Sequence, residues 1–202
     1  MKIKEIKENY YFETLTENHD VTHFDCGDDD LNDFLKNDAL KQQNANLNVT
    51  KLVIYKGDII GYFSLLTDTL ILKNIRDTDL KRDIKDMLEI KSKNRKLPAI
   101  KIGRFAIDEK YSGYGIGSDI LLNIVNNIRE ISKNQIGLRF IIVEGYAKAY
   151  TFYTEHSNFI NLEKDDKIIK EKLDIIIKKN PKQTFYLYLD LKILERDFTN
   201  IV

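Results

Sequence analysis

A cluster of glycines between an apolar strand and an apolar helix limits what this chain can fold into more than any other feature. Three of its nine glycines, Gly113, Gly115 and Gly117, fall within five positions. A side chain there would block a close approach or forbid a positive φ, so the glycines let backbone N–H groups converge on one point. The helix N-terminus adds about half a positive charge. We predict a pyrophosphate cradle; a plain turn with a close helix–strand contact is the alternative.

The predicted elements around this turn follow the order of an α/β protein. Apolar periodicity and turn residues predict strands at 9–16, 98–108, 138–145 and 184–194, a hairpin over 50–72 that turns at 56–58, and helices at 27–46, 78–90, 116–131, 146–159 and 164–179. Asp28 is the predicted N-cap of the first of these helices. Because neither a repeat nor a Pro/Ser/Gly-rich linker interrupts the order, we expect one domain over 1–202.

Composition and cysteine usage exclude several protein classes. Lys plus Arg equals Asp plus Glu at 32 each, so the net charge offers no global attraction to nucleic acid or membrane. Cys26 is the only cysteine, which excludes an internal disulfide; we take it as structural. The three histidines have no metal-ligand spacing, so no metal is expected. No apolar run approaches the ~18 residues of a membrane span. A cytoplasmic protein is therefore expected.

The glycine motif resembles one family and departs from two others. It lacks the Lys-Ser/Thr of a Walker loop and the G-x-x-G spacing of the dinucleotide fingerprint. Instead, "IGRFAIDEKYSGYGIGSDIL" resembles motif A of the GCN5-related N-acetyltransferases (GNAT), with Lys110 in place of the usual Gln or Arg. A second element of that family, A-x-x-F-Y-x-x-x-G-F, is similar to "AYTFYTEHSNF", which holds Tyr153. One extra residue follows Tyr153, and Asn158 replaces a glycine, which is tolerable because Asn accepts the left-handed conformation.

The resemblance covers about 98–160 and implies a fold and a site. The implied fold is the GNAT fold: a mixed, mostly antiparallel sheet with helices on both faces and a V-shaped splay between its two central strands. The implied cofactor is acetyl-CoA, bound by Phe105, Ala106, Ile107, Lys110, Ser112, Gly113, Tyr114, Gly115, Ile116 and Gly117. Tyr153 would protonate the leaving thiolate, because a tyrosine of pKa about 10 stays protonated at neutral pH. Glu144 is a candidate base.

A third match narrows the resemblance to one branch of the family. "FDCGDDDLNDFLKNDALKQQ" is similar to the N-terminal stretch of the acetyltransferase toxins of type II toxin–antitoxin pairs. That branch implies the α-amine of aminoacyl-tRNA as the acceptor and an antitoxin as a partner. Two alternatives stay open: an acetyltransferase of a small-molecule or protein amine, and a non-catalytic module that binds CoA or a partner.

Two charged segments, 73–97 and 164–182, look like helical insertions in this fold. Both are rich in lysine, so they could contact RNA phosphates, although a charge run is more often a solvated surface. Their apolar stripes equally suggest packing on the domain or on a second copy in a homodimer.

Overall fold

The computed structural model describes residues 3–162 and 165–192 and divides into two compact units. Unit 1 comprises residues 1–67 and 102–124, and unit 2 comprises residues 68–101 and 125–202. Strands β3 (Asp58–Ile71) and β4 (Lys96–Ile107) and helix α5 (Ile116–Asn134) contribute residues to both units. The single domain expected from the sequence stays a prediction.

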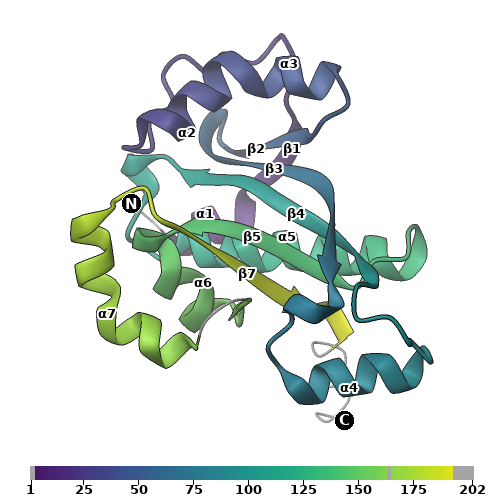
Figure 1. Cartoon of the computed structure of the whole chain (residues 1–202). Helices are drawn as coiled ribbons and strands as arrows, with labels where there is room; N and C mark the ends of the chain where they lie inside the picture. Colours follow the sequence, from purple (N-terminus) through teal and green to yellow (C-terminus); the bar gives the residue numbers. More distant parts are fainter. Residues whose placement is uncertain (1–2, 163–164, 193–202) are drawn as a thin grey trace. The chain divides into compact units, whose positions relative to one another are not determined.

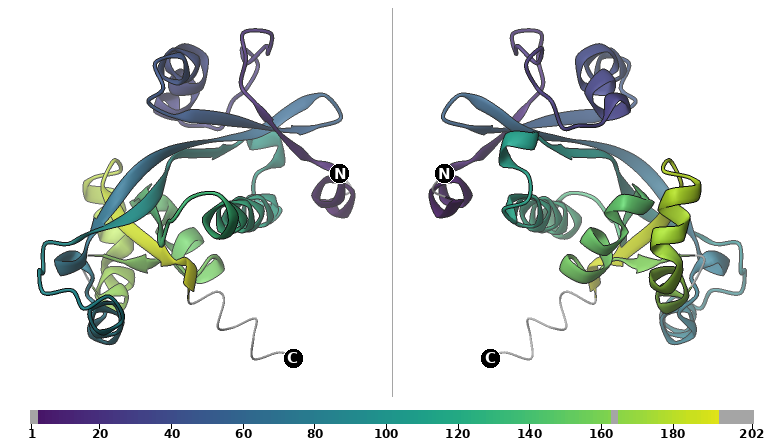
Figure 2. Two further views of the ribbon diagram at one scale, coloured as in Figure 1. Left: turned by 90° about the vertical axis from the view of Figure 1, so that its right-hand side faces the viewer. Right: turned by 90° about the vertical axis from the view of Figure 1, so that its left-hand side faces the viewer.

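Unit 1 has strands with helices over both faces (Figures 1 and 2). Its other elements are α1 (Ile3–Asn9), β1 (Tyr11–Thr14), α2 (Asp29–Asp33), the π-helical turn η1 (Phe34–Asp38), α3 (Ala39–Asn44), β2 (Val49–Tyr55) and the short 3₁₀ helix η3 (Glu109–Tyr111). Helices α2 and α3 cover one face, where Phe34, Leu35 and Ala39 pack on Leu52 and Tyr62. The other face meets α1 and the start of α5, where the Tyr10 hydroxyl donates to Asp119 Oδ2 over 3.0 Å.

Most elements predicted for unit 1 are confirmed, and two features are new. Asp28 caps α2 by accepting a hydrogen bond from Leu31 N over 3.2 Å, and the hairpin turns at residues 56–58. Helix α1 was not predicted, because only Ile6 among its seven residues is buried and its apolar signal is weak. The π-helical turn was also missed, since it adds one residue to a helical turn without a sequence signal of its own.

Unit 2 packs its helices on a separate apolar cluster. Its elements are the 3₁₀ turn η2 (Leu72–Asn74), α4 (Thr78–Met87), β5 (Phe140–Tyr146), the 3₁₀ turn η4 (Ala147–Ala149), α6 (Tyr150–His156), β6 (Ile160–Asn161), α7 (Asp166–Lys179) and β7 (Thr184–Asp190). Leu80 and Ile84 of α4 are buried against Phe140, Ile142 and Tyr188. The first charged segment therefore packs on the domain, as one of the predicted alternatives required.

Helix α7 packs on unit 2 through fewer residues. Ile169 is buried, and the Tyr150 hydroxyl donates to Asp166 Oδ1 over 2.5 Å, whereas Ile168 and Ile175 are more than half exposed. The sequence prediction of a helix from residue 164 and a strand to residue 194 reaches residues 164, 193 and 194, which lie outside the described residues. No helix in the described part of the chain is long and apolar enough to cross a membrane.

The strands hydrogen-bond in the order β1-β2-β3-β4-β5-β7-β6. The pairs β1/β2, β2/β3, β5/β7 and β6/β7 are all antiparallel. The predicted α/β class with a mixed, mostly antiparallel sheet is thus confirmed. The V-shaped splay between the central strands stays a prediction.

Candidate active site

The predicted site residues fall in two groups. Phe105–Ile107, Lys110 and residues 112–117 belong to unit 1, and Tyr153 belongs to unit 2.

Asp108 holds the chain in place where β4 ends and the glycine loop begins. This carboxyl is buried: its Oδ1 accepts from Lys110 N over 3.0 Å and its Oδ2 from Asp25 N over 3.2 Å. Glu109 N donates in turn to Asp25 O over 2.9 Å. These bonds tie the start of the loop to the segment before α2. Sequence reasoning missed Asp108, although an Asp between a strand and a 3₁₀ turn is a usual capping signal.

The loop between η3 and α5 needs glycine at two of the three predicted positions. Gly113 has φ +81° and Gly115 has φ +71°, both in the left-handed region. A Cβ on Gly113 would meet no atom within 4 Å, and one on Gly115 only Lys7 Nζ at 3.7 Å. The space over these glycines is therefore open. Gly117 differs from the prediction, because it lies in the first turn of α5 and has no positive φ.

Six consecutive backbone N–H groups in this loop and the first turn of α5 have no hydrogen-bond acceptor among the described residues. They run from Gly113 to Ser118, and the next residue, Asp119, already donates to Gly115 O. Four unpaired N–H groups are normal at a helix start, so the loop extends that set. Ser112, also predicted to bind the cofactor, is not part of this row, because its N–H donates to Glu109 O over 3.2 Å. Unpaired donors together with the helix dipole suit a diphosphate.

The end of β4 carries the residues predicted to hold the acyl part of the cofactor. Ala106 is buried among the apolar residues under α2, while Phe105 and Ile107 are half-buried. The backbone here lies unusually close to β3, since a Cβ on Gly61 would lie 2.8 Å from Ala106 O and 2.9 Å from Ile107 Cδ1. Gly61 therefore permits the position of residues 106–107. Sequence reasoning missed this role of Gly61.

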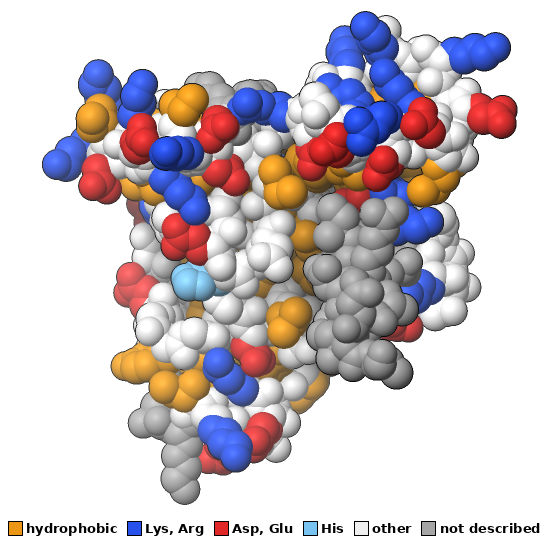
Figure 3. Space-filling model, turned by 90° about the horizontal axis from the view of Figure 1, so that it is seen from below, with side chains coloured by type: hydrophobic (Ala, Val, Ile, Leu, Met, Phe, Trp, Pro, Cys, Tyr) orange, Lys and Arg blue, Asp and Glu red, His pale blue; other side chains and the backbone are white. Residues whose placement is uncertain are grey.

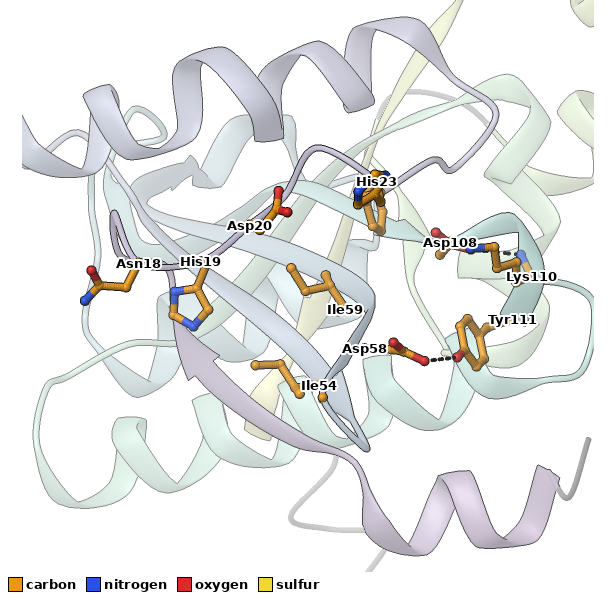
Figure 4. Close-up of a pocket in the computed structure, with 12 residues that line it drawn as sticks. Asn18, His19, Asp20, His23, Ile54, Asp58, Ile59, Asp108, Lys110 and Tyr111 are labelled. Carbon is orange, nitrogen blue, oxygen red and sulfur yellow. Dashed lines mark hydrogen bonds between the residues drawn. The ribbon is translucent and has the colours of Figure 1, made fainter.

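Beside the glycine loop, unit 1 has a cavity of about 400 Å³ (Figure 4). Its apolar wall includes Ile54 and Ile59, and Lys110 and Tyr111 line another side. The Tyr111 hydroxyl donates to Asp58 Oδ2 over 3.2 Å. Lys110, the first residue of the predicted motif, thus lines this cavity, and its predicted contact with the cofactor stays a prediction.

Tyr153 lies on α6 with its ring packed against a glycine of β5. A Cβ on Gly145 would lie 2.9 Å from Tyr153 Cε2, so only glycine admits the ring in this position. Phe152 and Phe159 meet the ring edge-on, with centroids 5.0 and 5.7 Å away. No described residue is hydrogen-bonded to the Tyr153 hydroxyl, and burial raises its pKa well above the ordinary 10.0. The Tyr153 hydroxyl is therefore neutral at physiological pH.

The turn after Tyr153 confirms one inference from the sequence. Asn158 has φ +57°, the left-handed conformation for which the family uses glycine. Phe159 N then donates to Tyr153 O over 3.1 Å and closes the end of α6. Asn at this position has the same backbone role as glycine, as predicted.

Glu144, the candidate base, is held in a polar cluster on β5. Burial acts to raise the pKa of Glu144, but the hydrogen bond and charge of Lys101, 2.9 Å away, outweigh it and leave the pKa below the ordinary 4.5. Thr184 Oγ1 donates to its other oxygen over 3.1 Å. A carboxylate stabilised in this way is a weak base.

Cys26 and the histidines do not form a second reaction centre. Burial raises the pKa of the Cys26 thiol, which is the opposite of what a nucleophilic cysteine requires. No group of three or more His, Cys, Asp or Glu side chains in the described part of the chain could hold a metal ion.

Comparisons with known proteins were made by sequence and by structure. No family model matches the chain. A tRNA-acetylating toxin of Mycobacterium tuberculosis is 25% identical over 146 residues, which cover 72% of this chain and 81% of that protein. The crystal structure of KacT with a Tyr-to-Phe substitution matches with a TM-score of 0.72 and 21% identity, covering 93% of this chain and 98% of that one.

A second solved structure, AtaT complexed with acetyl-methionyl-tRNAfMet, also has a TM-score of 0.72 and 21% identity, and covers 94% of this chain and 99% of that one. Further matching structures of AtaT contain acetyl-CoA or the C-terminus of the antitoxin AtaR. These relatives agree with the motifs quoted above. The predicted resemblance to the GNAT acetyltransferase toxins is confirmed, and this chain has their fold.

Proposed function

We propose that this protein transfers the acetyl group of acetyl-CoA to the α-amine of aminoacyl-tRNA and so acts as an inhibitor of translation. The observation that carries the proposal is the row of unpaired N–H groups from Gly113 to Ser118 at the start of α5. It occurs in a chain whose fold is shared with AtaT, a protein solved with acetyl-methionyl-tRNA and with acetyl-CoA.

The glycine loop would hold the diphosphate of the cofactor. Its unpaired N–H groups and the positive end of α5 supply the donors and the charge that a diphosphate needs. The open space above Gly113 and Gly115 leaves room for the ligand next to the backbone. Ala106 and Ile107, which lie where Gly61 admits the backbone of β4, would pair with the pantetheine arm.

Tyr153 would supply the proton that the departing CoA thiolate takes up. The amine nitrogen forms a bond to the acetyl carbon, the carbon–sulfur bond breaks, and the thiolate receives the phenolic proton. Burial raises the pKa of the Tyr153 hydroxyl above the ordinary 10.0, so Tyr153 stays protonated at physiological pH until the thiolate forms. The backbone N–H of Ile107 is our candidate donor to the thioester oxygen.

The attacking amine does not need a protein base in this scheme. An α-amine has a pKa near 8, so about a tenth of it is already neutral at physiological pH. Glu144 is bound to Lys101 and Thr184 and is a weak base, and we assign it no proton transfer. The attacking nitrogen loses a proton to water and the Tyr153 phenolate takes one back from water, so the reaction balances and the hydroxyl is restored.

The acceptor and partner follow from the relatives. AtaT is solved with acetyl-methionyl-tRNA and with the C-terminus of its antitoxin, and the Mycobacterium tuberculosis relative is a tRNA-acetylating toxin. An aminoacyl-tRNA acceptor and an antitoxin partner are therefore proposed for this chain. Charged tRNA is found in the cytoplasm, and we propose that location for the protein.

The experiment is acetyl transfer from radiolabelled acetyl-CoA to a panel of aminoacyl-tRNAs. We expect label on charged tRNA and none on uncharged tRNA, with Tyr153→Phe as the catalytic control. Label only on small amines or on protein amines would overturn the proposed acceptor. If acetyl-CoA releases no thiol with any amine, the chain is a binding module and the enzymatic proposal is wrong.

A further inference from the structure

The balanced net charge of the chain conceals a strong separation between its two units. Unit 1 has 9 Lys and Arg against 15 Asp and Glu, whereas unit 2 has 23 against 17. One unit thus carries a surplus of six negative charges and the other a surplus of six positive charges. The net charge of the whole chain offers no attraction to a polyanion, but the positive surplus of unit 2 does.

The positive surplus is concentrated in one short segment that follows α4 and ends at Lys96, the first residue of β4. Residues 91–96, which we call the basic loop, contain Lys91, Lys93, Arg95 and Lys96, and every residue of the loop is exposed. No Asp or Glu occurs between Glu89 and Asp108. In the described residues, no carboxylate lies within ion-pair distance of these four side chains. Figure 3 shows Lys and Arg side chains, with Asp and Glu side chains among them, over the part of unit 2 that carries α4.

Backbone hydrogen bonds give the basic loop a defined shape. Leu72 N donates to Arg95 O and Lys73 N to Lys93 O, each over 3.0 Å, so the loop is paired with the turn before α4. Arg95 N closes a turn within the loop on Ser92 O over 3.3 Å. This pairing brings the exposed Lys73 next to the loop as a fifth cation. The charges of the basic loop are therefore held together before any ligand binds, which lowers the entropic cost of binding.

Helix α7, the other lysine-rich segment, is built differently. Asp166, Glu171 and Asp174 alternate with its lysines, and Lys170 Nζ lies 3.1 Å from Glu155 Oε1. Its last two lysines stand at the helix C-terminus, where the dipole already favours positive charge. The lysines of α7 are therefore typical of a solvated helix surface.

We propose that the basic loop binds backbone phosphates of the RNA acceptor, and that α7 does not. The identity of the RNA in this inference rests on the proposed function, whereas the binding of RNA phosphates by the basic loop does not. Four or five exposed cations without a carboxylate match a row of phosphates. The basic loop has no exposed apolar side chain to insert among lipids, which favours RNA over a membrane surface.

The test compares two variants with the same loss of charge. One is K91Q/K93Q/R95Q/K96Q in the basic loop, and the other is K167Q/K170Q/K178Q/K179Q in α7. Binding of uncharged tRNA is measured by fluorescence anisotropy at several salt concentrations. We expect the loop variant to bind at least about tenfold more weakly and to lower the salt slope by about 3, since each phosphate contact contributes roughly 0.7–0.9. The α7 variant should stay within about twofold.

Two further measurements separate this inference from the proposed function. Acetylation of an aminoacyl-adenosine analogue without phosphates should be equal in the wild type and the loop variant, and the conservative K91R/K93R/K96R variant should keep RNA binding. If the wild type binds tRNA through the basic loop but acetylates no aminoacyl-tRNA, the proposed function is wrong and this inference stands. Equal losses in both Gln variants, or a loop that binds anionic vesicles and not tRNA, would overturn it.

Discussion

The position of the Tyr153 ring depends on the absence of a side chain at Gly145. In Gly145→Ala the new Cβ would lie 2.9 Å from Tyr153 Cε2 and 3.1 Å from Cδ2, where ordinary contacts begin at 3.4 Å. The ring must therefore move by at least about half an ångström. It is 7% exposed and lies between Phe152 and Phe159, so it has little free space to move into. Overpacking of this kind costs about 1–3 kcal/mol.

The effect on the reaction should be larger than the effect on stability. A displacement approaching 1 Å of a catalytic group can lower a rate about 100-fold, so we expect kcat to fall between about 10- and 100-fold. The midpoint of thermal unfolding should fall by about 2–4 °C for each kcal/mol. CoA affinity should be unchanged, because the glycine loop belongs to unit 1.

The assay is thiol release from acetyl-CoA at a saturating concentration of aminoacyl-tRNA, with CoA binding measured by calorimetry. Gly137→Ala is the matched control, since a Cβ at Gly137 would meet no atom within 4 Å. A Gly145→Ala protein with the wild-type kcat would refute the link between the ring position and turnover. Equal losses in both variants would show that the effect is not specific to Tyr153.

Three other substitutions test separate parts of the structure. Tyr153→Phe should lower kcat by about 10²–10⁴-fold and leave CoA affinity unchanged. The wild-type rate should rise with pH as the amine loses its proton near pH 8, and it should not fall before pH 10 because the pKa of Tyr153 is raised. A decline in rate below pH 9 would contradict the role of Tyr153 as the acid. Gly115→Val forces a β-branched residue to φ +71°, so CoA should bind at least about tenfold more weakly, as measured by calorimetry. Unchanged CoA affinity would mean that the glycine loop is not part of the cofactor site. Tyr188→Phe should unfold at the same temperature as the wild type or at a higher one. The reason is that the buried Tyr188 hydroxyl has no hydrogen-bond partner among the described residues, and burial raises its pKa to about 12. A lower midpoint of thermal unfolding would mean that this hydroxyl is paired.

Features that depend on a few neighbouring residues were predictable from the sequence. The Asp28 cap, the turn at residues 56–58, the positive φ of Gly113 and the left-handed Asn158 were expected or follow from residue type at a known offset. Backbone conformation is set largely by such local steric and hydrogen-bonding preferences. For the same reason the order of strands and helices, and with it the α/β class, was recognisable before the structure.

The tertiary structure alone decided which residues of each unit lie close together. Gly61 and Gly145 look like ordinary strand residues until the structure shows Ala106 and the Tyr153 ring against them. The unpaired N–H groups after Gly113 can be identified only once every acceptor in the described chain is accounted for. Close approach, hydrogen-bond pairing and the separation of charge between units depend on residues far apart in sequence. No local pattern contains that information, because folding brings those residues together.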